Sequence, residues 1–246
     1  MTEESPYFTP DYSVNIYGLN EQSVTVEFGT VISEEILQLI TSYNRVLMQN
    51  PFPGLITTVP AYCTLTVFFD PLLVHTSNLP GETCFDKVSY FLNHIKQSES
   101  RQAINKPVEI IIPVCYGGSF GADIETVAKI NQLSIAEVIE RHSSMQYIVY
   151  MIGFVPGFAY MGGMDASLQT PRKQVPDATI PAGSVGIAGM QTGIYPIETP
   201  GGWQIIGRTP LKMFDVNRAE PSLLKGGNLV RFRAINIDEF NTYGKQ

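Results

Sequence analysis

Apolar and polar positions along the first hundred residues follow two different periods. A period of two, typical of strands, runs through 14–17 and 23–28, and a strongly β-forming run covers 61–71. Helical spacing of apolar residues predicts one helix from about Ser33 and a second over 83–97. The resulting order, β-β-α-β-α, predicts a small α/β domain in which two helices cover one face of a sheet.

The pattern changes after a short polar segment at 98–102, which predicts a linker and a domain boundary near residue 105. A strand is expected at 108–114, and one helical region at 123–142. Short β runs separated by Gly and Pro follow, a spacing typical of a closed or partly closed barrel. We therefore predict an α+β protein with a sandwich-like α/β domain at 1–105 and a β-barrel domain at 106–246.

Composition narrows the class of protein. The 246 residues are 44% hydrophobic and 16% charged, as in ordinary globular proteins, and the net charge of −7 gives no electrostatic basis for nucleic-acid binding. No apolar run approaches the ~20 residues of a membrane helix, and the acidic start does not resemble a signal peptide. Three widely spaced cysteines fit reduced thiols. We expect a cytoplasmic protein that binds neither membrane nor nucleic acid, and no metal site.

Glycine, proline and aromatic residues are concentrated between 153 and 210, which predicts a rigid surface that binds a ligand or a partner. Within it, Phe158 and Tyr160 follow a Pro-Gly turn and could face a ligand, whereas Phe154 is expected to fill the core. Gln191 sits in a turn that could present its amide to a ligand, and Tyr195 starts an extended segment.

Trp203 follows two glycines, so it could either fill the core or form the wall of a pocket or interface; we favour the wall. Arg172 and Arg208 are held next to Pro and Gly, which favours bidentate binding of a carboxylate or phosphate. Lys173 is expected to be exposed without a partner. The alternating Arg231 and Arg233 are expected on the solvent face of a strand.

His142 closes a helix that a capping box starts near Ser134. Its spacing from the apolar stripe predicts a buried side chain at the helix C-terminus, where the helix dipole favours the protonated imidazole. The side chain could act as an acid or simply bond to a backbone carbonyl. Upstream, the turn at 116–123 lacks the lysine of a phosphate-binding loop, but Tyr116 and Asp123 could face a shared cleft.

Five segments, in order, carry a resemblance to a known family: 116–118, 153–158, 181–189, 191–196 and 200–203. The chain resembles the family of the B subunit of ATP-dependent 5-oxoprolinase, the kinase inhibitor KipI, and allophanate hydrolase subunit 1, the first half of the urea carboxylase carboxyltransferase region. The resemblance implies a cyclophilin-like barrel. It also implies ATP with Mg²⁺, shared with a partner, and partners homologous to the C subunit of 5-oxoprolinase and to its ring-opening A subunit.

Three functions remain open on these residues: a 5-oxoprolinase subunit inactive alone, a KipI-like inhibitor of a histidine kinase, and a carboxyltransferase half for a urea-like substrate. No cluster of histidines at metal-ligand spacing is present in the sequence. We favour the 5-oxoprolinase subunit, with His142, Arg172 and Arg208 as catalytic residues. The chain departs from the family at 20–23, where relatives carry Gly-Asp and a basic residue before the second strand.

Overall fold

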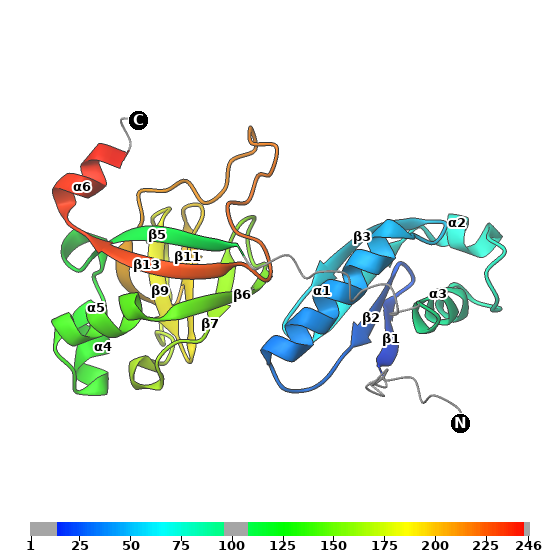
Figure 1. Cartoon of the computed structure of the whole chain (residues 1–246), viewed down its shortest axis with the longest axis horizontal. Coiled ribbons are helices and arrows are strands. Elements are labelled where there is room, and N and C mark those ends of the chain that lie inside the picture. Colours follow the sequence, from blue (N-terminus) through cyan, green and yellow to red (C-terminus); the bar gives the residue numbers. More distant parts are fainter. Residues whose placement is uncertain (1–13, 96–107, 244–246) are drawn as a thin grey trace, which may run out of the picture. The chain divides into compact units, whose positions relative to one another are not determined.

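The computed structural model describes residues 14–95 and 108–243. The chain divides into two compact units, Met1–Gln102 and Ala103–Gln246 (Figure 1). The predicted boundary near residue 105 lies in 96–107, outside the described residues.

The N-terminal unit is a four-stranded antiparallel sheet of order β1-β2-β4-β3 with helices packed on it. Its elements are β1 (Asn15–Asn20), β2 (Ser23–Glu27), α1 (Glu34–Gln49), β3 (Leu55–Pro60), β4 (Thr64–Phe69), α2 (Pro71–Thr76) and α3 (Cys84–Asn93). Buried side chains of β2, β4, α1 and α3 share one apolar core, and the Tyr43 hydroxyl of α1 donates to the Leu92 carbonyl of α3. The predicted arrangement of two helices on one sheet face is confirmed.

Capping explains where these helices begin. The Ser33 side chain accepts from the Ile36 N–H at the start of α1, and Thr83 forms a reciprocal capping box with Asp86 at the start of α3. Two elements were missed from sequence, β3 and α2. Pro71 was interpreted as the end of a strand, but it occupies the first turn of α2, where Asp70 caps two backbone N–H groups.

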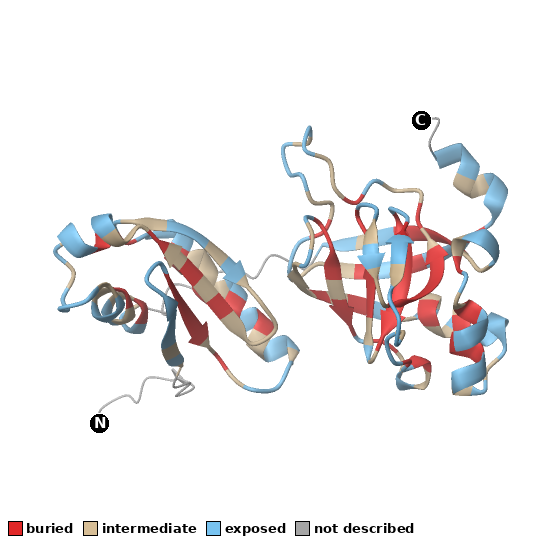
Figure 2. Cartoon of the chain, turned by 180° about the vertical axis from the view of Figure 1, so that it is seen from behind, coloured by how far each residue is buried: buried red, intermediate tan, exposed pale blue. Residues whose placement is uncertain are grey.

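The C-terminal unit is built around a closed barrel of seven strands, in the order β10-β7-β6-β13-β5-β12-β9. Its strands are β5 (Glu109–Tyr116), β6 (Gln146–Ile152), β7 (Ala159–Gly162), β9 (Ser184–Ala188), β10 (Gln191–Ile194), β12 (Gln204–Arg208) and β13 (Leu229–Ile235). One large core, including Val114, Tyr147, Ile187 and Phe232, fills the interior (Figure 2). The predicted barrel and the α+β class are confirmed.

The strand β13 completes this barrel by lying between β5 and β6, parallel to the first and antiparallel to the second. It pairs with β5 along its whole length, from Leu229 opposite Glu109 to Ile235 opposite Cys115. The first and last strands of the unit are therefore direct neighbours.

Helices lie outside the barrel, where α4 (Ile124–Asn131) packs against β12 and α5 (Ile135–Ser144) against β13. The sequence predicted one helical region at 123–142. The structure divides it because Gln132 adopts a left-handed conformation with φ 56° after α4, and Ser134 caps a new helix. Short 3-10 turns, η2 (Gly118–Phe120) and η3 (Ala166–Leu168), and the terminal helix α6 (Ile237–Thr242) complete this set.

A two-stranded ribbon of β8 (Asp177–Ile180) and β11 (Thr199–Gly201) adds to the barrel unit. A second, smaller apolar cluster includes Ile180 of this ribbon together with Phe158, Tyr195 and Trp203. The rigid 153–210 block of the sequence thus forms much of this cluster and the neighbouring strands.

Candidate functional site

His142 lies in the interior of the barrel unit, with a side chain that is completely buried. Its Nδ1 is 2.8 Å from the Tyr116 hydroxyl, and its Nε2 is 2.9 Å from Oγ1 of Thr192. Thr192 in turn donates to the Gly186 carbonyl. A hydroxyl has one proton, so Thr192 accepts from Nε2–H and His142 accepts at Nδ1 from Tyr116. Each group therefore donates to the next, from Tyr116 through the neutral imidazole of His142 and the Thr192 hydroxyl to the Gly186 carbonyl.

Burial lowers the pKa of His142 to about 3. The sequence argument expected the helix dipole to favour the protonated form, and this expectation was wrong because desolvation in the apolar interior outweighs a helix end. The His142 ring also stacks on Phe232, with ring centroids 4.5 Å apart. The neighbouring Ser143 turns its hydroxyl back to the Ile139 carbonyl of the same helix.

The aromatic residues of the block form a packed cluster. Phe158 is 1% exposed and contacts Tyr160, Tyr195 and Trp203, with ring centroids 4.7–5.3 Å apart. Phe154, by contrast, is 62% exposed and adopts φ 65°. The prediction that Phe154 fills the core was wrong, since Phe158 fills it and the loop turns Phe154 outward.

Trp203 and Tyr195 belong to the interior of this cluster, and Trp203 is 5% exposed. Burial raises the pKa of Tyr195 to about 12, so its phenol stays neutral. Tyr160 is only partly buried, and burial raises the pKa of its phenol too. Of these aromatic side chains, Tyr160 is the one best placed to touch a ligand.

Arg172 is an exposed cation held beside this cluster, with Cζ 6.0 Å from the centre of the Trp203 ring. The residues on both sides of it are fixed: the Pro171 carbonyl accepts from Gln204, and the Lys173 N–H donates to the Gly202 carbonyl. Among the described residues, no carboxylate forms an ion pair with Arg172. Such a fixed cation suits an anionic ligand.

Lys173 has partners, contrary to the prediction that it is exposed and unpaired. Its Nζ lies 2.7 Å from Oδ2 of Asp123 and 2.5 Å from Oδ2 of Asp177. The same Asp123 oxygen accepts from the Ile205 N–H. Asp123 therefore faces Lys173 and β12, whereas Tyr116 faces His142, so the two residues of the predicted shared cleft have different partners.

Arg208 ends β12, and its guanidinium carbon lies 5.7 Å from the centre of the Phe120 ring. The side chain is partly exposed, but its Nε is buried without a hydrogen-bond partner. Gln191 begins β10 and is partly exposed. Arg231 and Arg233 are exposed on β13, where they pair with Glu109 and Glu239.

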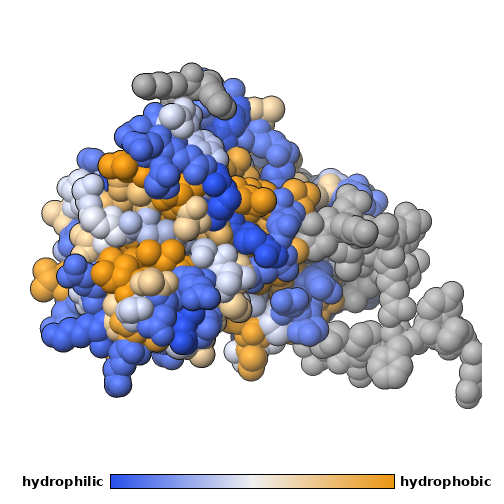
Figure 3. Space-filling model, turned by 60° about the vertical axis from the view of Figure 1, so that its left-hand side comes forward, coloured by the Kyte–Doolittle hydropathy of each residue, from blue (hydrophilic) through white to orange (hydrophobic). Residues whose placement is uncertain are grey.

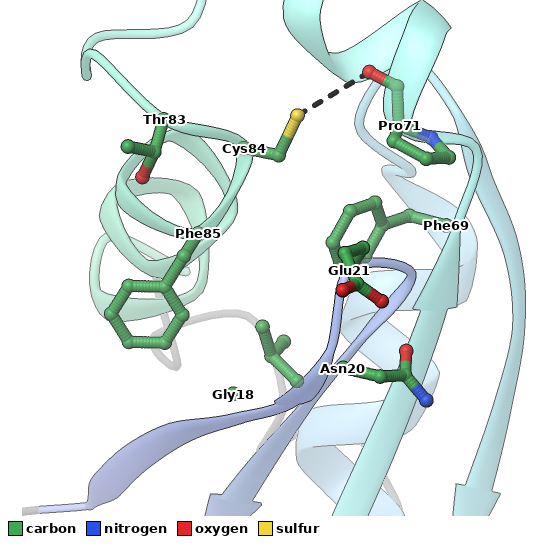
Figure 4. A pocket seen from close by; sticks show the side chains of 9 residues that line it. Gly18, Asn20, Glu21, Phe69, Pro71, Thr83, Cys84 and Phe85 are labelled. Atoms are coloured by element: carbon green, nitrogen blue, oxygen red, sulfur yellow. Dashed lines mark hydrogen bonds between the residues drawn. The ribbon is translucent and has the colours of Figure 1, made fainter.

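A cavity of about 440 Å³ lies elsewhere, in the N-terminal unit, between the β1–β2 turn and the start of α3 (Figure 4). Its floor includes the buried Val24 and Phe69, and the ring of Phe85 forms one side. The Cys84 thiol beside it donates to the Pro71 carbonyl. None of the residues predicted for the site lines this cavity. Two of its lining residues, Asn20 and Glu21, belong to the segment 20–23 in which the chain departs from the family that it resembles.

Two negative findings apply to residues 14–95 and 108–243. Within these ranges no group of three or more His, Cys, Asp or Glu side chains could hold a metal ion. No helix there is both long and apolar enough to cross a bilayer.

The architecture, a mixed α/β unit followed by a cyclophilin-like closed barrel, is that of carboxyltransferase-type domains. The family model "Carboxyltransferase domain, subdomain C and D" matches residues 14–224. The chain belongs to this family.

Curated relatives cover nearly the whole chain. It is 42% identical over 230 residues to the 5-oxoprolinase B subunit of Bacillus subtilis, covering 93% of this chain and 95% of the relative. It is 38% identical to the 5-oxoprolinase B subunit of Haemophilus influenzae, covering 92% of this chain and all of the relative.

Solved structures extend the comparison. TTHA0988 superimposes with a TM-score of 0.74 at 32% identity over 87% of this chain, which spans only 40% of that longer chain. Urea carboxylase of Kluyveromyces lactis shares the fold at 18% identity, with a TM-score of 0.73 over 97% of this chain and 23% of its own length.

Proposed function

We propose that this protein is the B subunit of an ATP-dependent 5-oxoprolinase, which opens the lactam of 5-oxoproline to glutamate. The observation that carries the proposal is the 42% identity to the 5-oxoprolinase B subunit of Bacillus subtilis over 93% of the chain. The relative is matched over 95% of its own length, so the likeness is not confined to one shared module.

The residues suit positioning and charge stabilisation rather than covalent attack. Arg172 is an exposed cation beside Trp203, and Arg208 reaches the surface from the end of β12. In the proposed mechanism these two arginines hold carboxylate and phosphate groups, and stabilise the charge that develops during phosphoryl transfer to the lactam oxygen. Tyr160 and Gln191, both partly exposed, orient the ring.

His142 has a positioning role in this mechanism. It is fully buried and neutral, so it fixes the hydroxyl of Tyr116, which ends β5 just before the turn at 117–121. Tyr195 and Trp203 act similarly, as a buried support behind Tyr160 and Arg172. The groups that would touch substrate are therefore fewer than the sequence suggested.

ATP enters the proposal as a substrate, with Mg²⁺, shared with a partner subunit. The described residues contain no cluster of ligands for a metal ion, and the turn at 116–123 has no phosphate-binding lysine. We assign the main nucleotide contacts to a homologue of the C subunit, and the completion of ring opening to a homologue of the A subunit. The assembly would act in the cytoplasm.

A partner surface is consistent with the exposed apolar residues of the barrel unit. Hydrophobic patches lie among hydrophilic side chains on one face of the molecule (Figure 3). Exposed apolar side chains in this unit include Phe154, Val175, Met190, Ile197 and Val216. Val175, Val216 and Phe154, which are 80%, 73% and 62% exposed, would lose much of their contact with water in a complex.

The test is 5-oxoproline-dependent ATP hydrolysis, measured on this chain alone and after reconstitution with homologues of the C and A subunits. We expect turnover only in the assembly. Arg208→Ala should lower it by roughly 100-fold, because it removes a cation that holds an anionic group of the substrate. Arg231→Ala, on the exposed face of β13, is the matched control and should leave it unchanged. An assembly that does not turn over 5-oxoproline would refute the proposal.

A further inference from the structure

Ser184 and Arg208 stand directly opposite each other on neighbouring antiparallel strands, β9 and β12. Residues paired in this way project from the same face of a sheet, with Cβ atoms about 5 Å apart. The Arg208 side chain passes beside Gly183, since a Cβ built on Gly183 would lie 3.3 Å from its Cγ. The arginine stem therefore lies next to the residue that precedes Ser184.

Each of these two side chains has a buried polar atom without a partner. They are Oγ of Ser184, a residue 1% exposed, and Nε of Arg208. In residues 14–95 and 108–243 only one other buried side-chain atom shares this condition, Oγ of Ser89 in α3. Buried polar groups in folded proteins are nearly always hydrogen-bonded, so two unpartnered ones on paired residues need an explanation.

The arginine charge is also uncompensated within the described residues, where none of the ion pairs includes Arg208. Its guanidinium has the Phe120 ring on one side. On the β5 side its register partner is Cys115, and burial keeps the pKa of that thiol above its ordinary value. Two cross-strand neighbours therefore each carry a buried donor, a hydroxyl and a guanidinium N–H, that has no acceptor in the described residues.

We propose that Ser184 and Arg208 form a subsite for an oxyanion, and that the group bound there is the carboxylate of the substrate. The inference deepens the proposed function and rests on it for the identity of the substrate. Arg208 contributes the charge from the partly exposed rim, and Ser184 donates a hydrogen bond from the floor.

The donor set favours a carboxylate over a phosphate. One guanidinium and one hydroxyl match the single negative charge and two oxygens of a carboxylate. A phosphate carries more charge and three acceptor oxygens, and its usual sites add backbone N–H groups or further cations. Arg172 is then left for the phosphoryl group, so the two arginines have different ligands.

Ser184→Ala in the reconstituted assembly tests the subsite. We expect the KM for 5-oxoproline to rise roughly tenfold, the effect of losing one hydrogen bond to a charged group. The KM for ATP and kcat should change little. The same variant should raise the Tm of the free chain, because it removes a buried donor that has no partner there. Arg208→Lys, which keeps the charge but not the planar fork, should also raise the KM for 5-oxoproline.

Ser89→Ala is the matched control, since it removes the other unpartnered buried hydroxyl and should leave both KM values unchanged. An unchanged KM for 5-oxoproline in Ser184→Ala, or a rise in the KM for ATP instead, would overturn the carboxylate subsite while leaving the proposed function intact. If the wild-type assembly shows no turnover, the proposed function fails. The subsite is then tested on the free chain, where 5-oxoproline, but not inorganic phosphate, should raise the Tm of wild type and not of Ser184→Ala.

Discussion

The ammonium group of Lys173 lies 2.7 Å from the carboxylate of Asp123, joining the segment that bears Arg172 to the start of α4. Both side chains are largely buried, with exposures of 17% and 16%. Asp177 of β8 contacts the same ammonium group. One cation thus connects three segments around the exposed arginine.

Lys173→Met should therefore lower the free energy of unfolding by about 1–2 kcal/mol, because it leaves the partly buried Asp123 without its cation. It should also lower turnover of the assembly, because the segment that bears Arg172 is then no longer attached to Asp123 and Asp177 through Lys173. Urea unfolding measures the first effect. Lys225→Met, which removes an exposed pair with Glu220, is the control and should cost less than about 0.5 kcal/mol. Equal costs for the two variants would contradict the role assigned to Lys173.

Stability should fall as pH is lowered because of His142. Its pKa is lowered to about 3 in the folded protein from an ordinary 6.5, so between these values only the unfolded chain binds the proton. The free energy of unfolding should therefore decrease by about 1.4 kcal/mol per pH unit from this residue below pH ~6, and show no contribution from it above pH ~7.

Urea unfolding between pH 4 and 7.5 measures this dependence. His142→Gln removes the titrating group. It should reduce the slope of the free energy of unfolding against pH by about 1.4 kcal/mol per pH unit, the contribution of one proton, whatever its effect on overall stability. His75→Gln, at an exposed position of α2, is the control for replacing a histidine by glutamine. If the free energy of unfolding of His142→Gln depends on pH as steeply as that of wild type, other groups cause the dependence.

Truncation of two phenylalanines four residues apart should destabilise the protein by very different amounts. Phe158→Ala should cost about 3–5 kcal/mol, because the ring is 1% exposed and packs against the rings of Tyr160, Tyr195 and Trp203. Phe154→Ala should cost less than about 1 kcal/mol, because its ring is mostly exposed. Thermal or urea unfolding measures both, and a costly Phe154→Ala would contradict the arrangement of this loop.

The turn that presents Phe154 should tolerate no side chain at Gly157. This residue adopts φ 85°, and a Cβ there would lie 2.9 Å from Cβ of Phe214. Gly157→Ala should destabilise the unit by at least about 1 kcal/mol. Gly227→Ala is the control for backbone strain alone, since Gly227 has φ 84° but no atom near the added methyl group. If Gly157→Ala destabilises the unit no more than Gly227→Ala does, the predicted clash with Phe214 does not occur.

Much of the fold could be predicted from the chain because strand and helix periods, capping residues and Gly-Pro turns are local signals. The start of α1 at Ser33 and of α5 at Ser134 are examples. Pro71 is ambiguous in the sequence because proline can end a strand or begin a helix, and the cap formed by Asp70 decides for the helix. The break at Gln132 depends on one left-handed residue, which no periodicity indicates.

The site was harder to predict because burial and pairing depend on contacts between distant segments. Burial keeps His142 neutral, and its tautomer follows from Tyr116 and Thr192, which lie on strands β5 and β10. The Lys173 partner Asp123 lies far away in sequence. Ser184 was not among the predicted site residues, because its register with Arg208 and its buried hydroxyl without a partner are visible only in the structure. The exchange of roles between Phe154 and Phe158 follows from a positive φ angle within one loop.

The position of β13 has a consequence for how the chain is made on the ribosome. The barrel needs this strand between β5 and β6, so β5 has no partner on that side until residues 229–235 have been synthesised. The N-terminal unit draws its core from residues before 96 and can complete it much earlier. During synthesis the barrel strands therefore have an unpaired edge for some time. Such edges can start aggregation, and chaperones protect chains in this state.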